Sequence, residues 1–170
     1  MTAASPDSGQ PKTPARPSGR SMARLAAVQA LYQIGLAAEP IETVLGEFVN
    51  HRFRAGDDDA AYSKPDIDLF CDIVRSVPVR RPELEPLVGN ALAKGWRLER
   101  LDRVMQALLL SGAYELVARP DVPTAVIINE YVDLAHAFFD DEQKGFAHAV
   151  LDRIAREVRP DPTRQDASSD

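Results

Sequence analysis

Residues 99–117 read ERLDRVMQALLLSGAYELV, and this stretch decides the fold of the chain. Its apolar side chains recur every three or four positions, which is the spacing of a helix with one buried side. The stripe that they form is wide, and a wide stripe lets a helix pack against neighbours on several sides. The stretch therefore predicts a central helix, with buried positions at Leu101, Val104, Met105, Leu108, Leu109, Gly112 and Leu116.

The same helical spacing runs through most of the chain on both sides of this stretch. Prolines stand where several segments begin, as expected for a first helical turn, and Asp121 is a candidate cap. No segment alternates like a strand. The sequence predicts an all-α fold, a compact helical bundle of about seven helices. The others are residues 20–37, segments after Pro40, Pro65 and Pro82, and residues 123–138 and 142–158, with a loop at 54–64.

The two ends of the chain differ in composition from the helical part. Residues 1–19 are rich in Pro, Ser, Gly and Ala, and residues 160–170 form a second polar segment. Such segments bury too little apolar surface to offset the entropy lost on ordering. We predict a disordered N-terminal tail at 1–19, a helical domain at 20–159 and a disordered C-terminal tail at 160–170.

The composition of the 170 residues indicates the cellular compartment and the class of binding partner. A single cysteine, Cys71, excludes an internal disulfide framework, and no apolar run suits a membrane span or a secretory signal. These features predict a cytoplasmic protein. The net charge of −6 argues against indiscriminate binding of nucleic acid, but the N-terminal segment is basic, which favours a polyanion at one place.

Motifs for catalysis are missing from the sequence. There is no Gly-rich phosphate loop and no Gly-x-Ser-x-Gly nucleophile motif. His136 lies about one helical turn from Asp133 and from Asp140, a spacing that is more often a solvated helix face than a metal site. We predict no enzymatic activity, no catalytic residue, no metal site and no cofactor.

Several short motifs follow one another in a fixed order. The chain has AR at 23–24 and VQALY at 28–32, then WRLERLDRV at 96–104, AYEL at 113–116, DVP at 121–123, INE at 128–130 and VLDRI at 150–154. In order and spacing these motifs resemble the NusB family of bacterial transcription antitermination factors.

The resemblance implies a fold of two packed helical subdomains and a protein that is not an enzyme. It also implies binding of single-stranded boxA RNA in ribosomal RNA leader transcripts. The partner in that binding would be NusE, a small-subunit ribosomal protein, and the complex would join RNA polymerase indirectly.

The first RNA-binding point that the resemblance implies is an arginine-rich segment, which corresponds to Arg16, Arg20 and Arg24 here. Ser21 and Met22 make this segment thinner than is usual in the family. Arg20 and Arg24 are four residues apart, so both should lie on one face of the first helical turns. Free backbone N–H groups at a helix start also favour phosphate.

The second RNA-binding point is Phe146, where the family has a phenylalanine implicated in contact with RNA. An aromatic ring can stack on an unpaired base, and Lys144 beside it could meet a phosphate. The spacing of Phe146, Val150 and Ile154 also fits a core stripe, so the sequence leaves both interpretations open.

The resemblance further implies a surface for NusE at Tyr32, Glu99 and Met105. Four further residues that recur in the family pattern are expected to cap or cross-link neighbouring helices instead: Tyr114, Glu115, Asn129 and Glu130.

Two other functions stay open. One is a helical scaffold that binds proteins and not RNA. The other is an RNA-binding module like those fused to ribosomal RNA methyltransferases, which is disfavoured because the chain leaves no room for a cofactor-binding domain after its last helix. The sequence does not distinguish a monomer from a homodimer.

Overall fold

The computed structural model describes residues 17–55 and 64–160, and this part of the chain is all-α, without a strand, as predicted. Its helices of seven residues or more are α1 (Gly19–Ala37), α2 (Ile41–Glu47), α4 (Ile67–Val79), α5 (Arg81–Ala91), α6 (Arg103–Ala118), α7 (Thr124–Phe138) and α8 (Asp141–Val158). A π-helical turn (Phe48–Arg52) and the short α3 (Phe53–Ala55) continue α2, so residues 54 and 55 are helical and not part of the expected loop. Residues 56–63 of that expected loop lie outside the described residues. The predicted tails fall almost wholly outside the described residues.

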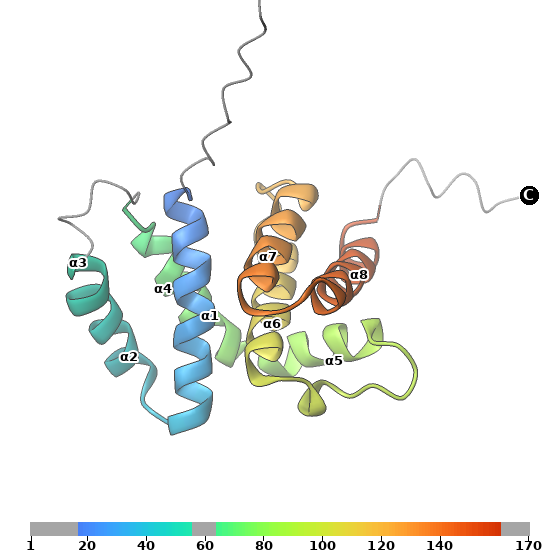
Figure 1. The fold of residues 1–170 in the computed structure, drawn as a ribbon, viewed down its shortest axis with the longest axis horizontal. Helices are drawn as coiled ribbons and strands as arrows, with labels where there is room; N and C mark the ends of the chain where they lie inside the picture. Colours follow the sequence, from blue (N-terminus) through green and yellow to red (C-terminus); the bar gives the residue numbers. More distant parts are fainter. Residues whose placement is uncertain (1–16, 56–63, 161–170) are drawn as a thin grey trace, which may run out of the picture.

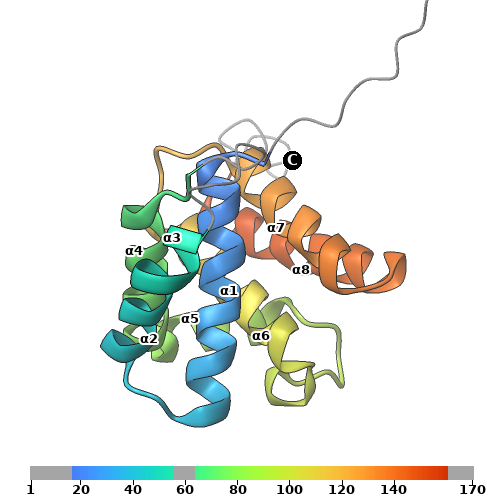
Figure 2. The same ribbon diagram turned by 60° about the vertical axis from the view of Figure 1, so that its left-hand side comes forward.

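The helices form two packed groups that meet along α1 and α6. In Figure 1, α1, α2 and α4 lie on one side, while α5, α7 and α8 gather around α6 on the other. Figure 2 shows α1 running along the height of the molecule, with α7 and α8 to one side of it. This arrangement matches the two packed subdomains that the sequence predicts.

α6 passes through the middle of the core, since eleven of its sixteen residues are buried. Gly112 brings it close to its neighbours: a Cβ there would lie 2.7 Å from Cδ2 of Leu151 and 3.4 Å from the Tyr131 ring. Both of those side chains are fully buried. The prediction of a central helix is confirmed, and the small size of residue 112 sets the separation between α6 and α8.

One expected helix start and one expected cap are wrong, and capping explains the first. α6 begins at Arg103 and not near residue 99, because the Asp102 carboxylate accepts the backbone N–H of Val104 at 2.8 Å and so starts the helix there. Residues 98–100 form a separate 3-10 turn. α7 begins after Pro123 with no side-chain cap, so Asp121 does not play the capping role expected of it.

Arg159 closes the C-terminal end of α6. The last carbonyl groups of a helix have no partner within the helix. The Arg159 guanidinium, just beyond α8, donates to the backbone carbonyls of Leu116 at 2.8 Å, Val122 at 2.6 Å and Arg119 at 2.5 Å. One side chain thereby joins the end of α8, the end of α6 and the connection that leads to α7.

A second polar link joins α4 to α6. The half-buried Asp72 carboxylate accepts hydrogen bonds from the Tyr114 hydroxyl at 2.9 Å and from Arg119 at 2.8 Å. Burial alone would raise the pKa of Asp72, but the hydrogen bonds from Arg119 and Tyr114 outweigh it, and the pKa lies below its usual range. Asp72 therefore stabilises the fold in its charged form.

We expect Asp72→Asn to destabilise the protein at neutral pH and to have little effect in acid. A carboxyl group with a lowered folded-state pKa stabilises the fold above its unfolded pKa, about 4, and that contribution is lost as the pH falls through the folded pKa. Urea denaturation as a function of pH should show parent and variant converging in acid. Asp133→Asn, at an exposed position of α7, is the control. A destabilisation by Asp72→Asn that is equal at every pH would contradict the assignment.

Candidate nucleic-acid interface

The first turn of α1 presents one exposed arginine. Ser18 caps the helix by accepting the backbone N–H of Ser21 at 3.0 Å. The Arg20 side chain is 58% exposed and lies 3.9 Å from the Asp66 carboxylate, at the limit of an ion pair. Arg20 is thus exposed beside a helix start, and the phosphate contact expected of it stays a prediction.

Arg24, one turn further along α1, is buried. Its side chain is only 2% exposed, and its Nε and Nη2 atoms each donate to the Glu115 carboxylate at 2.8 Å. The structure therefore corrects the expectation that Arg24 lies beside Arg20 on the RNA surface. Both donors point into the core, where no phosphate group can reach them.

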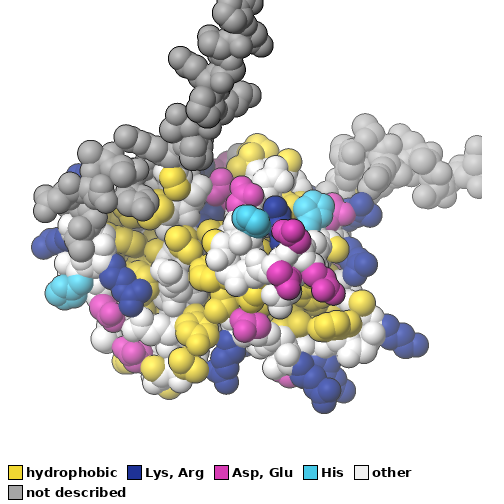
Figure 3. All heavy atoms as spheres, in the orientation of Figure 1, with side chains coloured by type: hydrophobic (Ala, Val, Ile, Leu, Met, Phe, Trp, Pro, Cys, Tyr) yellow, Lys and Arg dark blue, Asp and Glu magenta, His cyan; other side chains and the backbone are white. Residues whose placement is uncertain are grey.

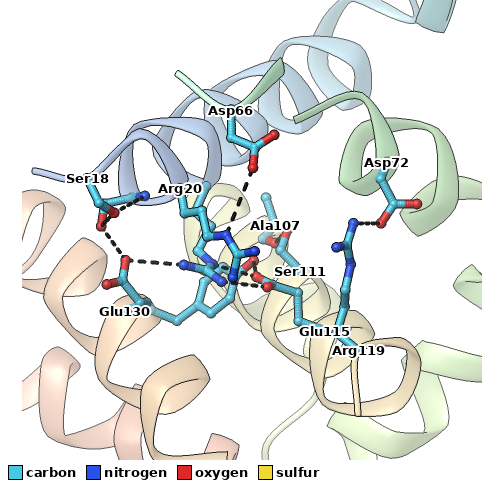
Figure 4. Close-up of polar contacts among 12 residues, drawn as sticks. Ser18, Arg20, Asp66, Asp72, Ala107, Ser111, Glu115, Arg119 and Glu130 are labelled. Carbon is cyan, nitrogen blue, oxygen red and sulfur yellow. Dashed lines mark hydrogen bonds and ion pairs between the residues drawn. The ribbon is translucent and has the colours of Figure 1, made fainter. Parts of the chain in front are cut away.

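Glu115 and Glu130 hold this turn of α1 against α6 and α7 (Figure 4). Glu115 also accepts the Tyr131 hydroxyl, while Glu130 accepts the Ser21 hydroxyl at 2.6 Å and lies 3.5 Å from Arg24. The expectation that these two glutamates cross-link helices is confirmed. Within the described residues, no buried side-chain nitrogen or oxygen lacks a hydrogen-bond partner.

The charges of this cluster reinforce one another. Burial alone would lower the pKa of the Arg24 guanidinium, but the hydrogen bonds and charge of Glu115 outweigh burial and raise it. Burial and the charge of Glu115 both raise the pKa of the Tyr131 hydroxyl, so Tyr131 stays neutral and donates. The contacts of this cluster hold α1 in place, and they thereby fix the position of the turn that carries Arg20.

Phe146 lies in the second turn of α8, half-buried against the core. Its ring centroid is 5.6 Å from that of Trp96, which comes from the connection between α5 and α6. Trp96 is 57% exposed. Lys144 lies two residues before Phe146, and Arg16, the remaining predicted RNA contact, falls outside the described residues.

The residues predicted to bind a protein partner separate in the structure. Tyr32 is 38% exposed and, with Leu36 and Phe138, lines a shallow groove of about 490 Å³. Glu99 is exposed but lines a different hollow. Met105 is only 3% exposed because it belongs to the buried stripe of α6, so the expected partner contact at Met105 is corrected.

The histidine positions single out no further site. His136 is exposed, and its Nδ1 lies 3.8 Å from Asp141. Across residues 17–55 and 64–160, no three His, Cys, Asp or Glu side chains are grouped so that they could hold a metal ion. In the same part of the chain, no helix has both the length and the apolar character to cross a membrane.

Comparison with known proteins identifies the family. The NusB family model matches residues 21–156. The transcription antitermination protein NusB of Sphingopyxis alaskensis is 49% identical over 85% of this chain and 97% of its own length, and that of Novosphingobium aromaticivorans is 49% identical over 82% and 95%. A solved structure of T. maritima NusB superposes with a TM-score of 0.69 at 28% identity, covering 88% of this chain and 96% of that one. The chain therefore belongs to the NusB family of non-enzymatic transcription antitermination factors, as its sequence motifs predict.

Proposed function

We propose that this protein binds the boxA RNA of ribosomal RNA leader transcripts together with NusE, and so promotes transcription antitermination. The observation that carries the proposal is the family match across residues 21–156, which span the helical domain. Two exposed surfaces support it, one basic and aromatic and one apolar. Action in the cytoplasm and an indirect link to RNA polymerase through the complex belong to the same proposal.

The RNA-binding surface of the proposal contains Arg20, Lys144 and Phe146, with Arg16 on the preceding segment. Arg20 is exposed beside a helix start, where backbone N–H groups and a guanidinium both favour phosphate. Phe146 is only half-buried, and an accessible aromatic ring can stack on an unpaired base. Arg24 does not contact the RNA itself. Its role is indirect, because it holds α1, the helix that carries Arg20.

The NusE-binding surface of the proposal is the groove at Tyr32. Leu36, Phe138 and Tyr32 expose 59%, 38% and 38% of their surface, and the three side chains line one hollow. Exposed apolar side chains gathered in this way are typical of protein-binding sites. Glu99, at the rim of a neighbouring hollow, is a candidate for a polar contact with the same partner.

The mechanism that follows is coupled binding. With a net charge of −6 and few exposed cations on the RNA surface, the protein alone should bind RNA weakly and in a salt-sensitive way. When this protein and NusE are bound side by side, their two surfaces form one continuous RNA site. Affinity then increases by a coupling free energy of about 1–3 kcal/mol.

We expect NusE to tighten boxA RNA binding and boxA RNA to tighten NusE binding by the same factor, because linkage makes the two effects equal. Calorimetry measures all four affinities, with a scrambled oligonucleotide as the control. RNA binding that ignores both NusE and the boxA sequence would overturn the proposal. NusE binding with no RNA binding in any mixture would favour the protein-scaffold function.

We expect Arg20→Ala to weaken RNA binding and to reduce the slope of log affinity against log salt by roughly 0.7, the value for one phosphate contact on a single strand. The Arg20→Ala variant should fold like the parent, because the Arg20 side chain is exposed. Arg75→Ala, which removes an exposed arginine from α4, is the matched control. An unchanged salt slope would show that Arg20 does not touch the RNA backbone.

A further inference from the structure

Trp96, the only tryptophan of the chain, is exposed at the surface next to Phe146. The two ring centroids are 5.6 Å apart and the ring planes are inclined by 40°, so neither ring covers the other completely. More than half of the Trp96 surface meets solvent, although tryptophan carries the largest apolar surface of any side chain. An exposed tryptophan beside a half-buried phenylalanine is an apolar surface of the kind found at binding sites.

The position of Trp96 beside α8 is fixed by the backbone. Arg153 of α8 donates to the carbonyl of Ala91 at 3.0 Å, at the end of α5, where the connection that carries Trp96 begins. That connection is further held by the buried Leu98. Trp96 and Phe146 therefore form a preorganised pair, although they are fifty residues apart in sequence.

The segment that carries Trp96 is basic. Residues 93–100 contain Lys94, Arg97 and Arg100 against one acid, Glu99. All four are exposed, and Glu99 lies 3.9 Å from Arg97. In Figure 3, Lys and Arg side chains border hydrophobic side chains on the side of the molecule that carries the α5–α6 connection. Exposed aromatic rings among cations suit a single-stranded nucleic acid, whose bases stack while its phosphates meet the cations.

We propose that Trp96 and Phe146 form a two-ring platform on which unpaired bases of the RNA stack, so that Trp96 is an RNA-binding residue. This inference rests on the proposed RNA-binding function. It adds a second aromatic contact to the Phe146 site, contributed by a different segment of the chain. Lys94, Arg97 and Arg100 then supply phosphate contacts on the same side.

The test measures binding of a boxA RNA oligonucleotide to the protein in the presence of NusE. Trp96→Ala should weaken binding by roughly 5- to 140-fold, the effect of losing one stacked base. Trp96→Phe should retain most of the affinity, because a ring remains. The salt slope should stay that of the parent, because stacking removes no phosphate contact. Val79→Ala, at an exposed apolar position of α4, is the control, and thermal melts check that each variant is folded.

The emission of Trp96 gives a second readout, because no other tryptophan contributes to it. Stacking on a base should quench or shift that emission on titration with RNA. If the parent binds boxA RNA but Trp96→Ala binds equally well, or if the emission does not change, the platform is refuted while the proposed function stands. If the parent binds no RNA with or without NusE, the proposed function fails and the platform fails with it.

Discussion

Glu115→Ala is expected to lower the free energy of unfolding by about 3–5 kcal/mol, because it leaves a buried charge without its partner. The Arg24 guanidinium is 2% exposed and donates two hydrogen bonds of 2.8 Å to this carboxylate. An arginine side chain does not lose its proton in a protein, so the guanidinium stays charged when Glu115 is removed. The same change removes the acceptor of the buried Tyr131 hydroxyl. Urea denaturation followed by circular dichroism measures the loss.

The control for this experiment is Arg75→Ala, which breaks an exposed ion pair with Glu42 and should change stability little. A triple variant with Arg24→Met, Glu115→Met and Tyr131→Phe should recover most of the lost stability, because apolar side chains of similar volume often replace a buried ion pair without cost. An unfolding midpoint of Glu115→Ala equal to that of the parent would contradict the assigned role.

Leu151→Ala is expected to lower the free energy of unfolding by about 2–5 kcal/mol, the usual cost of truncating a buried leucine. Leu151 is fully buried in α8 and lies directly against Gly112 of α6. The removed atoms include Cδ2, the atom nearest to residue 112, so the cavity opens between the two helices. Chemical denaturation gives the value, and an effect below that of an exposed leucine would contradict the packing.

The effect of Gly112→Ala on stability is expected to change sign when Leu151 is replaced by alanine. In the parent, the new methyl group would meet Leu151 at 2.7 Å, and overpacking of about 1–3 kcal/mol should exceed the roughly 1 kcal/mol that alanine gains over glycine in a helix. In the Leu151→Ala background the space is open, so the methyl group should stabilise. Gly89→Ala, with no atom within 4 Å of the new methyl group, should stabilise in both backgrounds. Equal effects of Gly112→Ala in both backgrounds would falsify this account.

The helices themselves could be predicted because apolar spacing is a local property of the sequence. The stripe of α6 is visible in residues 101–116, and the same spacing located the other long helices. Met105 is an example. Its place in the apolar stripe predicts burial, and Met105 is buried in the structure, so it is not available for the partner contact that the resemblance implies. Boundaries were less accurate, because Asp102 can start a helix only where the backbone presents its N–H groups to the side chain.

The orientation of Arg24 could not be predicted from spacing alone. Its partner Glu115 is 91 positions away in sequence, so nothing in the local pattern distinguishes a buried arginine from an exposed one. Most arginines lie at the surface, and burial of one requires a carboxylate already placed in the core. The Trp96–Phe146 pair was missed for the same reason, since it exists only where α8 meets the α5–α6 connection.

Arg159 shows that the folded unit extends beyond its last helix. A protein trimmed at Val158 would keep every residue of α8 and still lose the hydrogen bonds to Leu116, Arg119 and Val122. The end of α6 and the connection to α7 would then open more often to solvent, and amide exchange would be fastest there. Expression boundaries chosen from helix ends alone would thus remove a residue on which the middle of the sequence depends.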